Sequence, residues 1–496
     1  MDETPSLHLD FAACDRARLA QDPRFDGRFF IGVTSTGIYC RPICPAPTAK
    51  QRNVRYYPSA AAAAEAGFRP CLRCRPEAAP GTPAWLGTSA TVRRALRLIQ
   101  EGALDNQSVD QLSARLGIGP RHLHRLFVQH LGASPIAVAQ TRRLHFAKRL
   151  IDDTRLSMTD IALASGFGSL RRFNDAFRDT YGRAPRELRR ERKGEAAADD
   201  ALRLKLAYRP PYDWNAIRDF LATRAIPGVE RVAGDSYART ITVNDKSGWI
   251  EIHLVPKADA LELAVHGLGA ESLFLVVSRV RQMFDLAADP ADVRAVLKKD
   301  PLLMPLLRKR PGLRVPGAWD TFEIAVRAIL GQQVSVAAAR TFATRIVEKH
   351  GMPLATGSAG VSHMFPSPAV LAEADLTDIG LTGARARTLN ALAVAVRDGK
   401  VDLANGDELR ARLTEVPGIG AWTAEYVAMR GLSDPDAFPA GDLVLQRMAG
   451  GTKRLTEKQL LARAEQWRPW RAYAVLHLWR ASSDAAPMKQ KARKKA

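Results

Sequence analysis

The stretch from Leu413 to Arg447 constrains the fold more than any other part of this chain. Apolar residues at helical spacing lead up to Pro417, which ends a helix. Gly418 and Gly420 then allow a tight turn into a second helix. Because these glycines have no side chain, backbone N–H groups at the start of the new helix can approach a phosphate oxygen closely. The stretch therefore predicts a helical hairpin that holds a nucleic-acid backbone without reading its bases.

Asp442 follows the hairpin after a Pro-x-Gly loop and precedes an apolar helical run. Taken alone, such an Asp is a helix N-cap. Together with the hairpin it resembles the helix-hairpin-helix DNA glycosylase superfamily, and from about Leu206 to Trp479 the chain is similar to the AlkA type, 3-methyladenine glycosylase II. The resemblance implies that Asp442 drives cleavage of the base–sugar bond. Relatives that also nick the strand carry a Lys two residues after the second hairpin glycine, where this chain has Trp422, so we predict base excision without lyase chemistry.

The same resemblance implies a base pocket formed by Trp422, Tyr426, Trp479 and Phe220. Trp422 and Tyr426 are four residues apart and share one helix face, which a core stripe would also explain. The alternative for Phe220 is an ordinary core phenylalanine. Electron-rich rings attract a positively charged alkylated purine through cation–π contacts worth about 0.5–2 kcal/mol. A carboxylate at Asp442 would then stabilise the positive charge that grows on the deoxyribose, and would orient or deprotonate the attacking water.

The motif Gly331-Gln-Gln-Val-Ser335 predicts a further DNA contact. In the resembled family, the residue after the first Gln enters the duplex and fills the gap left by the flipped base. Here that residue is Gln333, where the AlkA type carries a leucine, so a polar wedge would hydrogen-bond the orphaned partner base. The family also implies a monovalent cation at the hairpin carbonyls. No Cys cluster follows this region, which excludes an iron–sulfur site there.

Four cysteines near the N-terminus form two close pairs, Cys40-x3-Cys44 and Cys71-x2-Cys74. This spacing lets the thiolates meet one tetrahedral zinc ion, and a zinc site that only holds the fold is the ordinary interpretation. The fifth cysteine, Cys14, has no partner in the sequence, and we predict a small buried apolar residue there.

The residues around those pairs, Phe29-Phe-Ile-Gly onward and Ala66-Gly-Phe-Arg-Pro, resemble the N-terminal domain of the Ada methylation-response family. The resemblance implies that Cys40 accepts a methyl group from a methyl phosphotriester in DNA, with zinc keeping the thiol deprotonated. Methylation would remove one negative charge and weaken repulsion from nearby phosphates, which makes the site an electrostatic switch. A purely structural zinc site remains the alternative. Candidate backbone clamps, or simply a solvated basic rim, are Arg41, Arg52, Arg55, Arg69, Arg73 and Arg75.

Two similar stretches about fifty residues apart begin with Leu112-Ser-x-x-x-Gly117 and Ile161-Ala-x-x-x-Gly166. Each continues into a basic helix, which is typical of a helix-turn-helix. Together with Tyr181-Gly-Arg-Ala-Pro they resemble the DNA-binding domain of AraC-type regulators. Each basic residue on these helices reads a base, contacts a phosphate or is solvated. The groove-facing candidates are Arg121, His122, Arg125, Arg171, Arg172 and Asn174.

These signals predict a multidomain chain, mainly α with α+β parts, which suits a length of 496 residues. The predicted parts are a zinc-bound α+β domain, two helix-turn-helix units, a small α+β domain, an all-α helix-hairpin-helix glycosylase domain and a basic disordered tail. A polar linker is predicted at 191–201. The predicted boundaries are 1–80, 84–193, 202–316, 317–480 and 481–496.

The net charge of +21 favours a polyanionic partner, and the chain has no long apolar run or signal peptide. We therefore expect a monomeric, cytoplasmic, nucleoid-associated protein whose partners are double-stranded DNA and RNA polymerase. The predicted function is a bifunctional response to DNA alkylation, in which a monofunctional glycosylase that removes alkylated purines is joined to a methyl-accepting transcription regulator. The alternative is a transcription regulator whose glycosylase half only binds DNA.

Overall fold

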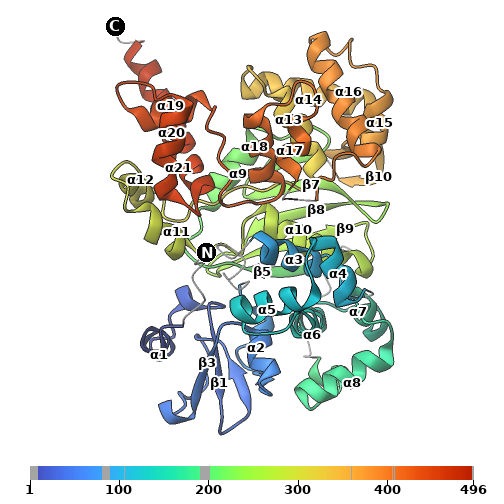
Figure 1. Ribbon diagram of the computed structural model, residues 1–496. Coiled ribbons are helices and arrows are strands. Elements are labelled where there is room, and N and C mark those ends of the chain that lie inside the picture. Colours follow the sequence, from blue (N-terminus) through green and yellow to red (C-terminus); the bar gives the residue numbers. More distant parts are fainter. Residues whose placement is uncertain are drawn as a thin grey trace.

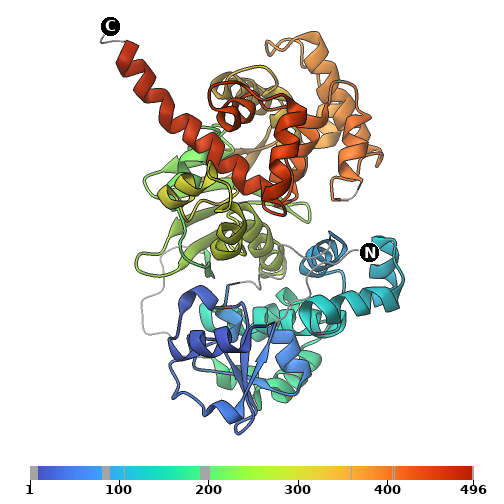
Figure 2. The ribbon, with the colours of Figure 1, turned by 60° about the vertical axis from the view of Figure 1, so that its left-hand side comes forward.

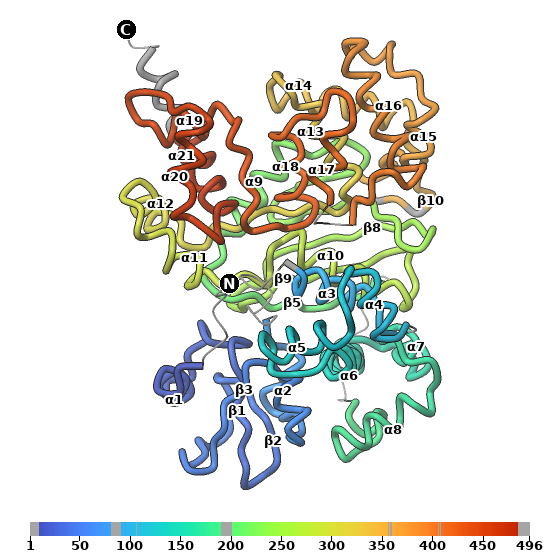
Figure 3. The backbone as a smooth tube through the Cα atoms, viewed as in Figure 1, coloured from blue at the N-terminus to red at the C-terminus, as the bar shows by residue number. Residues whose placement is uncertain are grey.

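The computed structural model describes residues 9–80, 90–105, 107–189, 201–358, 360–404, 406 and 408–493. Most of the predicted linker, residues 191–200, and the last three residues of the predicted tail lie outside that part. A four-stranded sheet and the first helices occupy one end of the molecule, a five-stranded sheet its middle and most C-terminal helices the other end (Figure 1). The backbone trace follows the chain through these layers in sequence order (Figure 3).

The N-terminal unit is a small sheet in the order β3-β1-β2-β4, flanked by two helices. Strand β1 pairs antiparallel with both β2 and β3, whereas β2 runs parallel to β4. The pairing of Tyr39 with Pro70 places Cys40 and Cys71 at the same end of two neighbouring strands. The elements are α1 (Phe11–Leu19), β1 (Phe30–Val33), β2 (Ile38–Cys40), β3 (Val54–Tyr57), α2 (Ala60–Glu65) and β4 (Arg69–Pro70).

The next unit contains the two predicted helix-turn-helix motifs. Gly117 ends the first helix of its motif with a φ of 70°, a left-handed conformation that glycine adopts without steric cost. Leu123 and Phe127 in one motif, and Phe173 and Phe177 in the other, are fully buried, which confirms that they face inward. The helices are α3 (Ala90–Gln100), α4 (Val109–Leu116), α5 (Pro120–Leu131), α6 (Pro135–Asp153), α7 (Met158–Ala164) and α8 (Leu170–Tyr181).

The middle layer is an antiparallel sheet in the order β5-β9-β8-β7-β6. Alternating residues at 202–208, 237–243, 249–255 and 261–265 predict four of its strands, and helices are predicted near 214–225 and 271–284. Strand β6, which is only four residues long, is not predicted. The elements of this stretch are β5 (Leu202–Ala207), α9 (Trp214–Ala222), β6 (Glu230–Ala233), β7 (Ser236–Val243), β8 (Lys246–Leu254), β9 (Ala260–His266), α10 (Leu273–Met283), α11 (Pro290–Leu297) and α12 (Leu303–Lys309). Helices α11 and α12 pack with the C-terminal helices (Figure 1).

The C-terminal layer is helical around α13, an apolar helix in which eight of the ten residues are buried. Buried ion pairs hold α13 on the sheet, since Arg239 donates to Glu323 at 2.6 Å. The helices are α13 (Thr321–Leu330), α14 (Val336–His350), α15 (Pro368–Glu373), α16 (Gly383–Arg397), α17 (Leu409–Thr414), α18 (Ala421–Gly431), α19 (Leu443–Gly450), α20 (Glu457–Ala464) and α21 (Arg471–Arg493).

Two expectations for this layer are wrong. The domain is not all-α, because β10 (Met352–Ser358) and β11 (Val361–Met364) form a hairpin, and the N–H groups of Ser362 and His363 donate to Gly228 beside the large sheet. The tail is not disordered from residue 481, because α21 continues to Arg493 and extends beyond its neighbours (Figure 2). Extending an existing helix avoids the cost of nucleating a new one.

Candidate active site and metal centre

The predicted hairpin lies between α17 and α18, and its two glycines play different parts. Gly418 has a φ of +88°, and a Cβ there would collide with the hydroxyl of Thr388. Gly420 is the N-cap of α18, and a Cβ there would meet nothing within 4 Å. Gly418 therefore serves the fold, while Gly420 leaves open space in front of the N–H groups of α18.

Gln333 is exposed between α13 and α14 with a φ of 55°, a conformation that costs energy for a residue with a side chain. The residue before it is held firmly. The amide of Gln332 donates to Gly418 O and to Thr423 Oγ1, each at 3.1 Å, and Arg385 donates to Gln332 O at 2.7 Å. These contacts fix the loop to the hairpin and hold Gln333 outward.

Asp442 is the N-cap of α19 and is half-buried. Its Oδ1 accepts from the N–H groups of Val444 and Leu445, each at 2.9 Å. The indole N–H of Trp479 donates to Oδ1 and that of Trp422 to Oδ2, each at 3.3 Å. Asp442 is thus a helix N-cap, as its position in the sequence alone predicts. The two indole contacts show that capping is only part of what this carboxylate does structurally.

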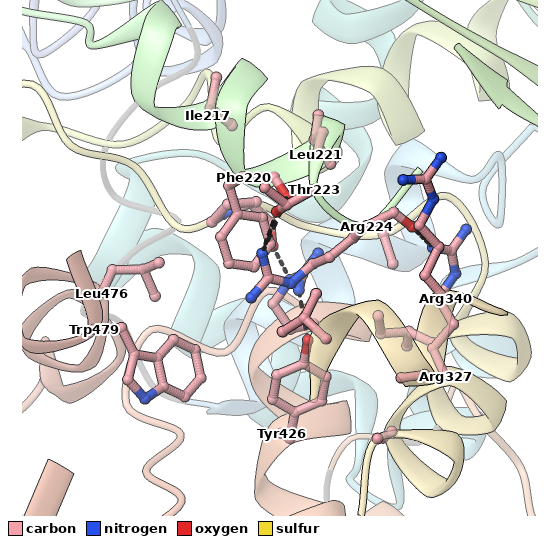
Figure 4. A pocket seen from close by; sticks show the side chains of 18 of the residues that line it. Ile217, Phe220, Leu221, Thr223, Arg224, Arg327, Arg340, Tyr426, Leu476 and Trp479 are labelled. Carbon is pink, nitrogen blue, oxygen red and sulfur yellow. Dashed lines mark hydrogen bonds between the residues drawn. The ribbon is translucent and has the colours of Figure 1, made fainter. Parts of the chain in front are cut away.

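Asp442 and all four predicted pocket aromatics line one cavity of about 580 Å³. Trp422 and Tyr426 stack with ring centroids 5.2 Å apart, and Trp479 is tilted against Tyr426 at 6.2 Å. Phe220, Tyr426 and Trp479 face a common space in Figure 4. The structure therefore brings together residues from α9, α18, α19 and α21, while their roles in catalysis stay a prediction.

Several arginines line the cavity, none of which the sequence singled out, and two of them lie against the Phe220 ring. Arg224 lies 3.7 Å from the Phe220 ring centroid and Arg430 lies 4.7 Å from it. Arg430 donates to the hydroxyl of Tyr426 at 2.8 Å, and Arg224 extends between Phe220 and Tyr426 (Figure 4). Burial alone would raise the pKa of the Tyr426 hydroxyl, but Arg430, Arg224 and Arg327 outweigh it and lower that pKa. Part of the cation–π capacity of the pocket is therefore already used by the protein.

The four predicted metal ligands, Cys40, Cys44, Cys71 and Cys74, form one cluster with all sulfur atoms within 4.8 Å of one another. Four thiolates about 2.3 Å from a central ion would stand about 3.8 Å apart, so this donor set fits a tetrahedral zinc ion. Cys71 and Cys74 are buried, whereas Cys40 and Cys44 are partly exposed. Hydrogen bonds from Cys40 and Cys74 lower the pKa of the Cys44 thiol, which favours its thiolate form. Cys14 is buried away from the cluster, as predicted.

Two of the predicted backbone clamps have other roles, since both lie in ion pairs inside the protein. Arg41 pairs with the buried Asp26, and its backbone N–H donates to Cys74 Sγ at 3.3 Å. Arg75 pairs with Asp152 at 3.0 Å and so joins the zinc unit to α6. The charges of these two are therefore already partnered within the protein, and the exposed candidates are Arg52, Arg55, Arg69 and Arg73, whose role as clamps stays a prediction.

The candidate groove-facing side chains of the helix-turn-helix units lie on the exposed faces of α5 and α8. Arg171 is 92% exposed and lies 3.9 Å from Asp175, a distance that gives little stabilisation at the surface. Their role as base readers stays a prediction. The exposed residues are Arg121, His122, Arg125, Arg171 and Arg172, and Asn174 is half-buried.

Four protein families match successive parts of the chain. They are the metal binding domain of Ada at residues 13–77, a helix-turn-helix domain at 112–191, the AlkA N-terminal domain at 203–320 and the HhH-GPD superfamily base excision DNA repair protein at 326–472. With the cavity and the cysteine cluster, these matches define a helix-hairpin-helix DNA glycosylase fused to a zinc domain and a helix-turn-helix domain. This domain content supports DNA glycosylase activity, zinc binding and DNA as a partner.

One relative matches nearly the whole chain, and two others match parts of it. The chain is 41% identical to the probable bifunctional transcriptional activator/DNA repair enzyme AlkA of Mycobacterium tuberculosis (strain ATCC 25618 / H37Rv), over 95% of this chain and 97% of that protein. It is 38% identical to DNA-3-methyladenine glycosylase 2 of Escherichia coli (strain K12), over 55% of this chain and 95% of that enzyme. It is 35% identical to the Escherichia coli enzyme Ada, over 34% of this chain and 47% of that protein. The chain belongs to the family of bifunctional AlkA/Ada-type transcriptional activator and DNA repair proteins. No helix in the described part of the chain has the length and hydropathy that a membrane crossing requires.

Proposed function

We propose that the C-terminal half excises alkylated purines of the 3-methyladenine type from double-stranded DNA. The observation that carries this proposal is the position of Asp442, which lies in a cavity with Trp422, Tyr426 and Trp479 next to the phosphate-accessible hairpin. The cavity, about 580 Å³, is large enough for a flipped nucleobase. Glycosylase relatives support the same assignment.

In this mechanism the hairpin N–H groups around Gly420 hold a backbone phosphate, and Gln333 fills the gap left by the flipped nucleotide. The glycosidic bond breaks, and its electron pair leaves with the base. Positive charge develops on the deoxyribose and is stabilised by Asp442, after which a water molecule adds to the sugar and loses a proton. Trp422 offers no amine to attack the sugar, so the strand stays intact. A monovalent cation at the hairpin carbonyls remains part of the proposal, since Gly418 O accepts only the Gln332 amide among the described residues and keeps a lone pair.

The test is a duplex that carries a single alkylated purine, scored for free base and for strand nicks. We expect free base without nicks until alkali is added. Tight duplex binding without any base release would favour the alternative, a regulator whose glycosylase half only binds DNA.

We further propose that Cys40 accepts a methyl group from a methyl phosphotriester. Cys40 is one of the two partly exposed cysteines of the cluster, while Cys71 and Cys74 are closed to DNA. A bound zinc ion would keep the thiols deprotonated. The Cys40 sulfur then bonds to the methyl carbon, the carbon–oxygen bond breaks and the phosphodiester anion leaves. Mass spectrometry should find one added methyl on Cys40 after exposure to methylated DNA. An unmodified Cys40 would instead support the structural zinc site.

The resulting loss of negative charge would strengthen DNA binding by the helix-turn-helix units and activate transcription, with RNA polymerase as the recruited partner. For this regulatory role we propose a monomer that acts at the nucleoid. We also keep the division of the chain into the five predicted parts, 1–80, 84–193, 202–316, 317–480 and 481–496. Reporter transcription from a promoter that the protein binds, measured for wild type and for Cys40→Ala, tests this part.

A further inference from the structure

A cationic surface lies on α19 and α20, outside every part of the site described above. Residues 443–464 contain one acidic side chain, Glu457, next to five basic ones. Four of these five, all exposed, have no ion pair or side-chain hydrogen bond within the described residues. We define the α19–α20 surface by these four and one exposed apolar neighbour, namely Arg447, Lys453, Arg454, Lys458 and Leu443.

Other arginines of α20 and of the neighbouring α21 are neutralised. Arg463 pairs with Asp300 at 3.0 Å, Arg471 with Asp436 at 2.8 Å, and Arg480 with Asp484 at 3.3 Å. The unpaired cations are therefore not the general condition of this part of the molecule. Like charges gathered without partners destabilise a surface slightly and are retained most simply where a polyanion binds.

The connection between α19 and α20 folds back on α19 and keeps these charges together. The N–H of Leu455 donates to Gln446 O at 3.1 Å, so the turn with Lys453 and Arg454 is anchored beside α19. Arg447 and Leu443, which is 51% exposed, are four residues apart and share one face of α19. An exposed apolar side chain among cations suits a partner with phosphates and with sugar or base edges.

The position of this surface identifies the partner. Helix α19 begins at Asp442 and helix α18 begins at the hairpin, and both N-terminal turns line the same cavity. Helices α19 and α20 lie across the C-terminal layer from α17 (Figure 1). A duplex that presents a nucleotide to the cavity continues past it on both sides, and the hairpin holds only one of them.

We propose that the α19–α20 surface binds the DNA backbone on the side of the flipped nucleotide opposite the hairpin. This proposal rests on the proposed glycosylase function, because that function places the duplex over the cavity. The surface acts through charge and sets how tightly the duplex is held. It contributes nothing to the chemical step.

The test is the salt dependence of binding to a short duplex with one stable abasic-site analogue. Log affinity falls linearly with log salt, and each lost phosphate contact makes this fall less steep by about 0.9. Lys453→Gln with Arg454→Gln should therefore reduce the magnitude of the slope by about 1.8. Between about 50 and 200 mM salt, the advantage of the wild type should then shrink about twelvefold. The matched control is Lys298→Gln with Lys299→Gln, an exposed pair at the end of α11 that removes the same charge away from the cavity.

An unchanged slope in the Lys453/Arg454 variant, or an equal change in both variants, would overturn the proposal. An unchanged slope would mean that the surface does not bind DNA and would favour an acidic protein as its partner. An equal change in both variants would mean that only the net charge of the protein matters, and not the position of these residues. Single-turnover base release at saturating enzyme should equal that of the wild type. If the wild type releases no base, the glycosylase proposal fails, while the comparison of slopes still decides whether this surface binds DNA.

Discussion

Replacing Asp442 with Asn isolates the charge of the carboxylate from its structural role. Asn is as good an N-cap as Asp, so its side-chain oxygen can still accept from Val444 and Leu445. The amide nitrogen would then take the place of Oδ2 and face the indole N–H of Trp422, which loses its acceptor. We expect a modest loss of stability, about 1–3 kcal/mol, and retained DNA binding.

The effect on chemistry should be much larger. A carboxylate about 4 Å from a developing unit charge, at the effective dielectric constant of about 20 that suits a half-buried site, contributes about 4 kcal/mol. That corresponds to a loss of base release of about 10³-fold. The assay is single-turnover release of base from alkylated duplex at saturating enzyme, which separates the chemical step from binding.

The matched control is Asp320→Asn, since Asp320 caps α13 by accepting from Glu323 N–H at 2.8 Å and does not line the cavity. The control should release base at the wild-type rate. Release by the Asp442→Asn variant within about tenfold of the wild type would refute the electrostatic argument, because removing a charge at that distance should raise the activation free energy by more than a tenfold change allows.

Further predictions concern the hairpin and the folded state. Gly420→Ala should weaken duplex binding about tenfold in a titration, because the new Cβ meets only the approaching phosphate, and should lower the melting temperature only slightly through the poorer N-cap. Gly418→Ala should lower the melting temperature much more, through its collision with Thr388. Glu323→Gln should reduce the free energy of unfolding by about 3–5 kcal/mol, because it leaves Arg239 buried without a carboxylate. Denaturant titration measures this loss, and the control, Glu408→Gln in an exposed ion pair, should lose less than about 1 kcal/mol. Burial lowers the pKa of His477 to about 4, below about 6.5 in the unfolded chain, so stability from its neutral form is present above pH 6.5 and lost as the pH falls towards 4. His477→Gln should reduce that acid loss by about 3 kcal/mol in unfolding titrations across the range, and an unchanged loss would contradict the assignment.

Much of the fold could be predicted because local signals were strong. Gly418 requires a left-handed turn, and alternating apolar residues mark four strands of the large sheet. Short strands were not predicted, because four residues, as in β6 and β11, show too little periodicity to detect. The helical extension of α21 was not predicted because Ser482, Ser483 and Pro487 and the basic residues after them are typical of a solvated tail.

The candidate site was predictable only in part. The aromatics and Asp442 came from a family resemblance, because nothing in local spacing shows that Phe220 and Trp479 face one cavity. Arg224 and Arg430 were missed because an arginine in a sequence is most often a surface residue. Only the tertiary structure reveals that Arg430 is 3% exposed and lies against two aromatic rings.

The contacts of Asp442 suggest which of its oxygens acts on substrate. Oδ1 accepts from two backbone N–H groups and from Trp479, so little of its capacity remains. Oδ2 accepts only from Trp422 among the described residues and keeps room for a water molecule or for a sugar bearing positive charge. By the family resemblance, Trp422 stands where strand-nicking relatives carry a lysine, and its indole N–H donates to Oδ2. In the proposed mechanism Trp422 would therefore both leave the site without a lyase nucleophile and orient the carboxylate, which connects a single residue of the hairpin helix to both halves of the proposed chemistry.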